Sequence, residues 1–325
     1  MRQLTFSQAV LEAQMEEMEK DQHVFIIGED VAKMGSAFGQ CAGLYDRFGP
    51  NRVFNMPVAE SGYANFGVGA AMAGKRPIVE MQFADFIVYA FDAVGNQGPK
   101  QRYMSGGELS VPMTIRAPQG AGFGAAAQHS QCVEAWFMNF PGLKIVMPSN
   151  PHDAKGLLKT AIQDNDPVLF LEHKQLLGMK GDVPEGEYTI PLGQASVVRE
   201  GKDVTIIALQ AMVYPALEAA TELADEGIDV EIIDPRSLIP LDKKTLAQSV
   251  KKTGRVIIVH EAPKRGGFGG EISAVISEEF FPHLKAPIKR LGAANIPLPF
   301  GMPEQYCLPN KVLITECVKE LMNPK

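Results

Sequence analysis

The chain alternates short apolar runs with longer amphipathic segments. Apolar residues recur at helical spacing after Ser7, so the pattern predicts a helix that has Ser7 as its N-cap and continues to about Lys20. Strands of the first half are predicted at residues 24–27, 76–83, 113–118, 144–148 and 167–171, and further helices at 61–74, 86–103, 132–140 and 150–163. Alternation of this kind predicts a parallel sheet that is covered on both faces.

The pattern lapses between about Leu176 and Gly201, where glycine, proline and charged residues dominate. A second alternating series follows, with strands predicted at residues 204–209, 230–234, 255–260 and 287–291 and helices at 213–227, 242–253, 270–281 and 309–322. The sequence therefore predicts an α/β protein of two doubly wound parallel-sheet domains, at residues 1–180 and 202–325, joined by a linker at 181–201.

Composition narrows the classes of partner. The net charge of -7 and the pI near 5.5 argue against a nucleic acid or an anionic membrane as the main partner, which leaves small molecules and proteins. We expect a cytoplasmic protein, because the start lacks a signal-peptide pattern and no apolar run is long enough to cross a bilayer. The widely scattered cysteines are expected to be reduced and structural.

Glu60 is the one acidic side chain in the small and apolar run at residues 55–69. Pro57 ends an extended approach, and Ser61 and Gly62 can turn and open a helix. Burial disfavours the charged form of a carboxylate, so Glu60 is a candidate proton donor or acceptor. A glutamate at a helix N-terminus can also serve only to favour the helix dipole.

Two other stretches are candidates for chemistry. The glycine-rich run at 120–124 matches a dinucleotide loop only weakly, since no helix follows directly and no acidic residue ends the next strand. Its alternative is a tight loop that carries His129 into a cleft, or simply a loop with a polar residue. Asp164 and Asp166 offer oxygens for a cation, and Asx-turn chemistry explains them equally well.

Several motifs occur together along the whole chain: Gly28-Glu-Asp-Val31, Val58-Ala-Glu-Ser-Gly62, Glu80-Met-Gln-Phe-Ala-Asp-Phe86, Arg102-Tyr-Met-Ser-Gly-Gly107, Gln128-His-Ser-Gln131, Pro141-Gly-Leu-Lys144, Asp153-Ala-Lys-Gly-Leu157 and Lys252-Thr-Gly-Arg255. In combination they resemble the β subunit of the E1 component of thiamine-diphosphate-dependent 2-oxo acid dehydrogenase complexes. The resemblance implies a transketolase-like pyrimidine-binding domain followed by a transketolase-type C-terminal domain.

The resemblance gives roles to particular residues. Glu60 matches the glutamate that hydrogen-bonds the pyrimidine N1′ of thiamine diphosphate and so favours the imino tautomer that removes the thiazolium C2 proton. Phe86 matches an aromatic position that stacks beside the pyrimidine ring. His129 matches the histidine that assists substrate binding and acyl transfer to the lipoyl arm of the E2 component. Glu29 is a candidate member of the hydrogen-bond relay, but not a catalytic residue.

The resemblance also implies ions and partners. Positions that bind a structural potassium ion, mostly through backbone oxygens, match Met113, Ala161, Ile162, Asp164 and Asp166, the last of which is Asn in many relatives. The Gly-Asp-Gly motif that holds the diphosphate through Mg²⁺ does not occur in this sequence. In this family the α subunit carries that motif, so the expected enzyme is an α2β2 heterotetramer with the cofactor at α/β interfaces.

The substrate is less well defined than the cofactor. Residues 120–131 and 179–185 are more similar to acetoin dehydrogenase β subunits, whereas 128–132 and 69–74 resemble pyruvate dehydrogenase β subunits. Branched-chain enzymes usually carry a second histidine earlier in the loop. Acetoin is therefore favoured over pyruvate and branched-chain 2-oxo acids. The rival of another class is a non-catalytic assembly subunit, and a nicotinamide dehydrogenase is the weakest alternative because the acidic ribose contact is missing.

Overall fold

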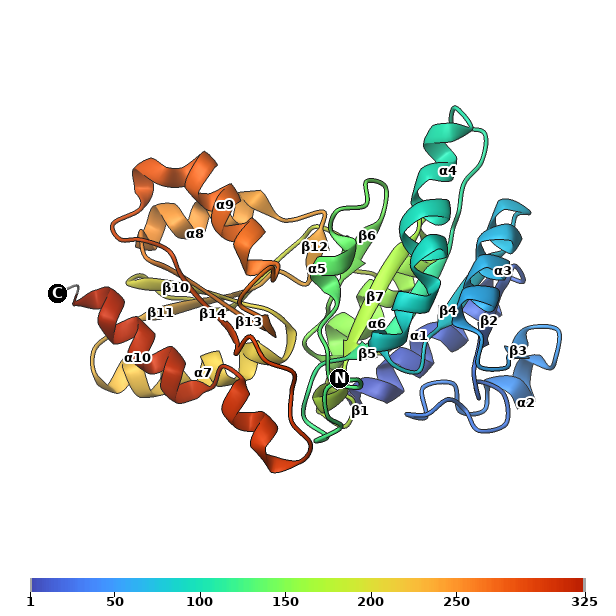
Figure 1. The fold of residues 1–325 in the computed structure, drawn as a ribbon, viewed down its shortest axis with the longest axis horizontal. Coiled ribbons are helices and arrows are strands. Elements are labelled where there is room, and N and C mark those ends of the chain that lie inside the picture. Colours follow the sequence, from blue (N-terminus) through green and yellow to red (C-terminus); the bar gives the residue numbers. More distant parts are fainter. Residues whose placement is uncertain (1, 324–325) are drawn as a thin grey trace. The chain divides into compact units, whose positions relative to one another are not determined.

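The chain folds into two units in the computed structural model, which describes residues 2–323 (Figure 1). The first unit contains the residues up to Gln119 together with Trp136–Leu192, and the second contains Gly120–Ala135 together with the residues from Gly193 onward. The chain passes between the units at residues 192 and 193, within the segment predicted as a linker. Segment 120–135, which lies within the first half of the sequence, contacts mainly the second unit.

A parallel sheet with the strand order β6-β7-β5-β4-β2-β3 forms the centre of the first unit. Every residue of β2, β5 and β7 is buried, as expected for parallel strands covered on both faces. The strands are β2 (Val24–Gly28), β3 (Val53–Asn55), β4 (Arg76–Glu80), β5 (Thr114–Gln119), β6 (Lys144–Val146) and β7 (Val168–His173). The predicted fold class is thus confirmed for this half of the chain.

The helices predicted at 7–20, 61–74 and 150–163 are confirmed to within two residues. The one predicted over 132–140 is helical only at Glu134–Phe137, and the helix at Leu44–Phe48 was not predicted. The helices of the first half are α1 (Phe6–Lys20), α2 (Leu44–Phe48), α3 (Glu60–Met72), α4 (Gly98–Met104), α5 (Glu134–Phe137) and α6 (Pro151–Gln163), and α1 packs on α6. The prediction of Ser7 as the first N-cap is wrong. Thr5 caps α1, because its hydroxyl accepts from the Gln8 N–H at 3.1 Å while the Gln8 side chain accepts from the Thr5 N–H at 2.8 Å.

The helix predicted over 86–103 is instead divided into three pieces. A 3₁₀ segment, η1 (Ala84–Ala90), and a π-helical segment, η2 (Asp92–Gln97), precede α4. Pro99 has no N–H to donate and stands in the first turn of α4, where that loss is tolerated. Gly95 packs so closely that a Cβ there would lie 2.7 Å from the Phe140 ring. Tertiary packing therefore overrides a continuous helix at this place.

Arg116 lies in the middle of the first unit and is completely buried. Its Nη1 donates to Glu80 Oε2 at 2.9 Å and to Gln14 Oε1 at 2.7 Å, and its Nε donates to Glu172 Oε1 at 2.6 Å. Burial raises the pKa of Glu172, and the charge of Arg116 opposes that shift. This ionic group ties α1 to three neighbouring strands from the interior.

The second unit has its own sheet, with the order β14-β13-β10-β11-β9. Parallel pairing joins β10 to β11 and β13, and β13 to β14, while β9 is an antiparallel edge strand. Helices α8 and α9 cover one face of this sheet, and α7 and α10 cover the other (Figure 1). The elements are β9 (Ser196–Arg199), β10 (Val204–Ala208), α7 (Val213–Asp225), β11 (Val230–Asp234), α8 (Lys243–Thr253), β13 (Val256–Pro263), α9 (Gly269–Phe280), β14 (Lys289–Ala293) and α10 (Lys311–Met322).

The remaining elements show that the predicted linker is not a free segment. Strand β8 (Lys180–Val183) pairs with β1 (Arg2–Thr5) in the first unit, and β9 belongs to the sheet of the second. The other short elements are η3 (Lys174–Leu176), η4 (Gln210–Met212), β12 (Ser237–Ile239), η5 (Phe281–His283) and η6 (Met302–Cys307). Within residues 2–323, every helix is too short or too polar to span a bilayer.

Candidate functional site

Glu60 is the first residue of α3, the helix that follows β3 at the carboxyl end of the parallel strands. Ligands of open parallel sheets bind at this edge. The Glu60 side chain is buried, with 7% of its residue surface exposed, and among residues 2–323 no group donates a hydrogen bond to its carboxylate. The positive end of the helix dipole offsets part of the cost of burying this charge.

Glu29 and Tyr63 form a buried hydrogen-bonded pair close to Glu60. Glu29 follows the end of β2, and the Tyr63 hydroxyl donates to Glu29 Oε1 at 3.4 Å. Burial raises the pKa of Glu29, and the negative charge of Glu60 raises it further. Burial also raises the pKa of Tyr63, so this hydroxyl remains a proton donor. The two carboxyl groups thus interact electrostatically, which suits Glu29 to hold a proton beside Glu60.

Sequence reasoning missed Tyr63, although its spacing is a usable signal. It stands three residues after Glu60 in α3, and residues at that spacing lie on the same side of a helix. The predicted aromatic residue, Phe86, lies in η1 and is half-buried. Its ring packs edge-on against Phe83, with centroids 5.7 Å apart and planes at 74°. Phe86 therefore belongs to a small cluster of packed aromatic rings in the first unit.

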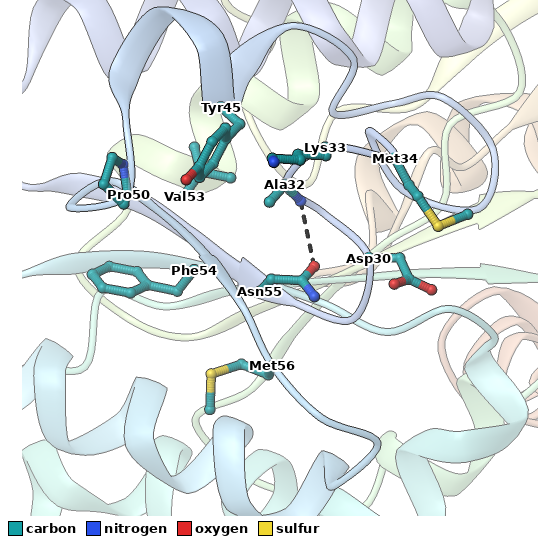
Figure 2. Close-up of a pocket in the computed structure, with 10 residues that line it drawn as sticks. All are labelled: Asp30, Ala32, Lys33, Met34, Tyr45, Pro50, Val53, Phe54, Asn55 and Met56. Atoms are coloured by element: carbon teal, nitrogen blue, oxygen red, sulfur yellow. Dashed lines mark hydrogen bonds between the residues drawn. The ribbon is translucent and has the colours of Figure 1, made fainter.

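A cavity of about 490 Å³ opens at the ends of β2 and β3 (Figure 2). Its polar lining includes Asp30, Lys33 and Asn55, and the side-chain Oδ1 of Asn55 accepts from the Ala32 N–H at 3.5 Å. The lining residues are Asp30, Ala32, Lys33, Met34, Tyr45, Pro50, Val53, Phe54, Asn55 and Met56. Glu60 and Phe86 are not among them, so this cavity is not assigned to either predicted role.

His129 lies in the loop between β5 and α5, and it belongs to the second unit. Its side chain is half-buried, and its backbone N–H donates to the Ala126 carbonyl at 3.3 Å. The glycine-rich part of this loop is anchored by two buried carboxylates, Glu261 and Glu304, which accept hydrogen bonds from its backbone. No local sequence pattern indicates either glutamate, because both come from segments far along the chain.

The residues predicted to bind potassium lie near the end of α6 and the adjoining strands. Arg76 donates from Nε to the Ile162 carbonyl at 2.9 Å and from Nη2 to the Asp164 carbonyl at 2.5 Å. The Met113 carbonyl accepts from the Val168 N–H at 3.0 Å, and the Ala161 carbonyl accepts from the Asp164 N–H at 3.3 Å. A carbonyl oxygen has two lone pairs, but two of these oxygens already accept from the Arg76 guanidinium, which is itself a cation.

The two predicted carboxylates already have protein partners. Asp164 accepts from Lys144 Nζ at 2.6 and 2.7 Å, and Asp166 accepts from Arg102 Nε at 2.5 Å. Asp164 Oδ1 also accepts from the Asp166 N–H at 2.9 Å, which is the Asx-type turn that the sequence allowed as the alternative. Among the described residues, no three His, Cys, Asp or Glu side chains gather as a metal site. Potassium binding therefore stays a prediction that rests on the backbone oxygens.

Comparison with known families gives the class of the protein. Residues 2–180 match the transketolase pyrimidine-binding domain, and residues 193–314 match the transketolase C-terminal domain. A split-gene transketolase, solved as an inactive β4 tetramer, has the same fold, with a TM-score of 0.79 and 26% identity over 98% of both chains. The protein thus has the transketolase-like two-domain α/β fold.

Curated relatives narrow this class further. The 2-oxoisovalerate dehydrogenase subunit beta of Bacillus subtilis is 47% identical over 98% of both chains. The beta subunit of acetoin:2,6-dichlorophenolindophenol oxidoreductase from the same species is also 47% identical, over 99% of this chain and 98% of the relative. The pyruvate dehydrogenase E1 component subunit beta of Staphylococcus aureus is 44% identical over 99% of both. The chain belongs to this family of E1 β subunits of 2-oxo acid and acetoin dehydrogenases.

Proposed function

We propose that this chain is the β half of a thiamine-diphosphate-dependent E1 enzyme that cleaves acetoin or a 2-oxo acid and passes the acyl group to a lipoyl-bearing E2 component. The observation that carries the proposal is the Glu60 carboxylate, which is buried at the carboxyl edge of the sheet without a hydrogen-bond donor. A carboxylate whose oxygens no protein donor occupies can accept a hydrogen bond from a ligand, so a ligand that carries a donor fits this place.

The chemistry of the site fits the pyrimidine half of thiamine diphosphate. Glu60 would accept a hydrogen bond from a protonated ring nitrogen, and Phe86 would cover the face of the ring. Burial and the negative charge of Glu60 raise the pKa of Glu29. Glu29 would therefore hold a proton, so that the two neighbouring carboxyl groups are not both charged. The bound cofactor supplies an activated carbon and an electron sink for the cleaved bond. The proposed role of His129 is to assist substrate binding and acyl transfer.

An α subunit would complete the enzyme in an α2β2 heterotetramer. The sequence has no Gly-Asp-Gly motif for the Mg²⁺ diphosphate, so the proposal assigns that half of the site to the partner. The non-catalytic alternative is an assembly subunit that keeps the fold alone. Its support is the split-gene transketolase chain that was solved as an inactive β4 tetramer. The Glu60 carboxylate favours the catalytic proposal, because it accepts no hydrogen bond from residues 2–323 and so has oxygens open to a ligand.

The identity of the substrate can be tested by comparing turnover on several candidate compounds. The relatives named for 2-oxoisovalerate, acetoin and pyruvate enzymes are 47%, 47% and 44% identical, which does not separate the three. Our proposal keeps the preference for acetoin that residues 120–131 suggest. The chain is produced together with an α subunit, and reduction of an artificial acceptor is measured with acetoin, pyruvate and branched-chain 2-oxo acids. Absence of thiamine-dependent turnover on all of them would refute the proposal.

The variant Glu60→Gln tests the role of the carboxylate. The amide has the same shape, but its oxygen is a far weaker proton acceptor, so turnover should fall by about 10²-fold or more while the assembly with α stays intact. The exposed Glu108→Gln in the same unit is the matched control and should keep wild-type turnover. Near-normal activity of Glu60→Gln would show that the proton-relay assignment is wrong.

A further inference from the structure

Two buried glutamates of the second unit hold the backbone of the glycine-rich loop. Glu261, in β13, accepts from the Ala121 N–H at 2.5 Å. Glu304, in η6, accepts from the Gly122 N–H at 2.9 Å and from the Gly124 N–H at 2.8 Å through the same oxygen, Oε1. Only 7% of Glu261 and 6% of Glu304 are exposed. Hydrogen bonds from amides to ionised carboxylates are among the stronger kinds in proteins.

Backbone contacts reinforce this attachment on both sides of the loop. The Gly301 N–H donates to the Gly124 carbonyl at 3.0 Å, and Ala125 forms an antiparallel bridge with Phe300. Gly124 has a φ of +62°, and a Cβ there would lie 2.7 Å from the Gly301 Cα. The Gly120 N–H donates to the Gln131 carbonyl at 3.1 Å and closes the base of the loop. The loop is therefore fixed at its base and along its glycine-rich arm.

The energetics of Glu304 favour the attached loop. Its Oε2 is buried and accepts no hydrogen bond from residues 2–323, and no cation within those residues forms an ion pair with it. The loop amides are therefore the donors that compensate for the lost hydration of this carboxylate. Detachment of the loop would break both of these hydrogen bonds to the carboxylate, so the carboxylate stabilises one loop conformation.

We propose that Glu261 and Glu304 are positioning residues that hold the loop carrying His129, and that acyl transfer depends on them. The inference rests on the proposed function, in which His129 assists that transfer. His129 follows the anchored Gly124 by only a few residues, and its own backbone N–H bonds back to Ala126. A misplacement of the loop would therefore move the imidazole, and small displacements of a catalytic group lower rates strongly.

The test uses the complex with the α subunit and a lipoyl domain of the E2 component. Two rates are measured in each variant: reductive acylation of the lipoyl domain, and reduction of an artificial acceptor that needs only carbon–carbon cleavage. Glu304→Ala should lower the ratio of acylation to cleavage by about tenfold or more, from the loss of its hydrogen bonds. Glu304→Gln keeps an accepting oxygen, so its ratio should fall less, and His129→Ala should give the same selective loss as Glu304→Ala.

A second measurement needs no activity. Hydrogen exchange of the amides at 122 and 124, which donate to Glu304, should be slow in the wild type, faster in Glu304→Gln and fastest in Glu304→Ala. The exposed Glu316→Gln in α10 is the matched control and should change neither measurement. If Glu304→Ala does not fold, the comparison of Glu304→Gln with the wild type still decides the question.

The outcomes separate this inference from the proposed function. Equal losses in acylation and cleavage, or loop amides that exchange as slowly in the Glu304 variants as in the wild type, would overturn the positioning role. A wild-type complex without any thiamine-dependent turnover would overturn the proposed function and, with it, the catalytic part of the inference. The exchange data would then still report whether Glu304 holds the loop.

Discussion

We expect His260 to make the second unit sensitive to acid. Its ring lies in β13 with 1% of the residue exposed, and neither ring nitrogen has a hydrogen-bond partner among residues 2–323. Three glycines enclose the ring, since a Cβ at Gly267, Gly269 or Gly292 would lie 2.4, 2.5 or 2.9 Å from its atoms. Burial lowers the pKa of His260 to about 4, and the charge of Arg290 acts in the same direction. The nearby backbone of Ala262 raises the pKa of His260 and so opposes this lowering, although it does not form a hydrogen bond of normal geometry with the ring.

The sign and size of the effect follow from proton linkage. An unfolded histidine binds a proton below about pH 6.5, whereas the folded one does so only near the lowered pKa. The unfolded state therefore binds more protons between these values, and stability falls as the pH falls through that window. Acidification from about pH 7 to about pH 5 should cost about 2 kcal/mol through this one side chain.

The assay compares the wild type with His260→Leu, which removes the titrating group but keeps an apolar side chain in the cradle. Native-state hydrogen exchange of β13 amides reports the opening free energy of this unit. The wild type should lose about 2 kcal/mol more than His260→Leu between the two pH values. His283→Gln, an exposed histidine of the same unit, is the control and should behave as the wild type. An equal acid response of wild type and His260→Leu would refute the reasoning.

Two further predictions concern the first unit. Arg116→Met should lower the free energy of unfolding by about 3–5 kcal/mol in urea titrations, because it leaves the buried Glu80 and Glu172 without a cation. The control is Arg47→Met, at an exposed arginine. A loss below about 1 kcal/mol in Arg116→Met would contradict the account. If the predicted oxygens bind K⁺, replacement of Na⁺ by K⁺ at constant ionic strength should raise the thermal midpoint as the K⁺ concentration rises. The corresponding gain in the free energy of unfolding is about 2.7 kcal/mol at a hundredfold excess over the dissociation constant. An identical midpoint in both salts would remove the potassium proposal.

Local sequence was sufficient for the framework of the fold. Continuous apolar runs such as that of β2 predict strands covered on both faces, and helical periodicity with Asn150 before Pro151 predicts α6 and its cap. The same local reading found Glu60 as an acid isolated in a small-residue run, and the structure places it at the first turn of α3. The family roles of Glu60, Phe86 and His129 came from the resemblance, not from the pattern.

Only the tertiary structure decided what surrounds those residues. It showed that Tyr63 bonds Glu29 beside Glu60, and that the His129 loop belongs to the second unit. The reason is physical: periodicity records which side of an element is buried, over a span of a few turns. The hydrogen bonds that hold the His129 loop join residues 140 to 182 positions apart, and no local pattern specifies a partner at that distance.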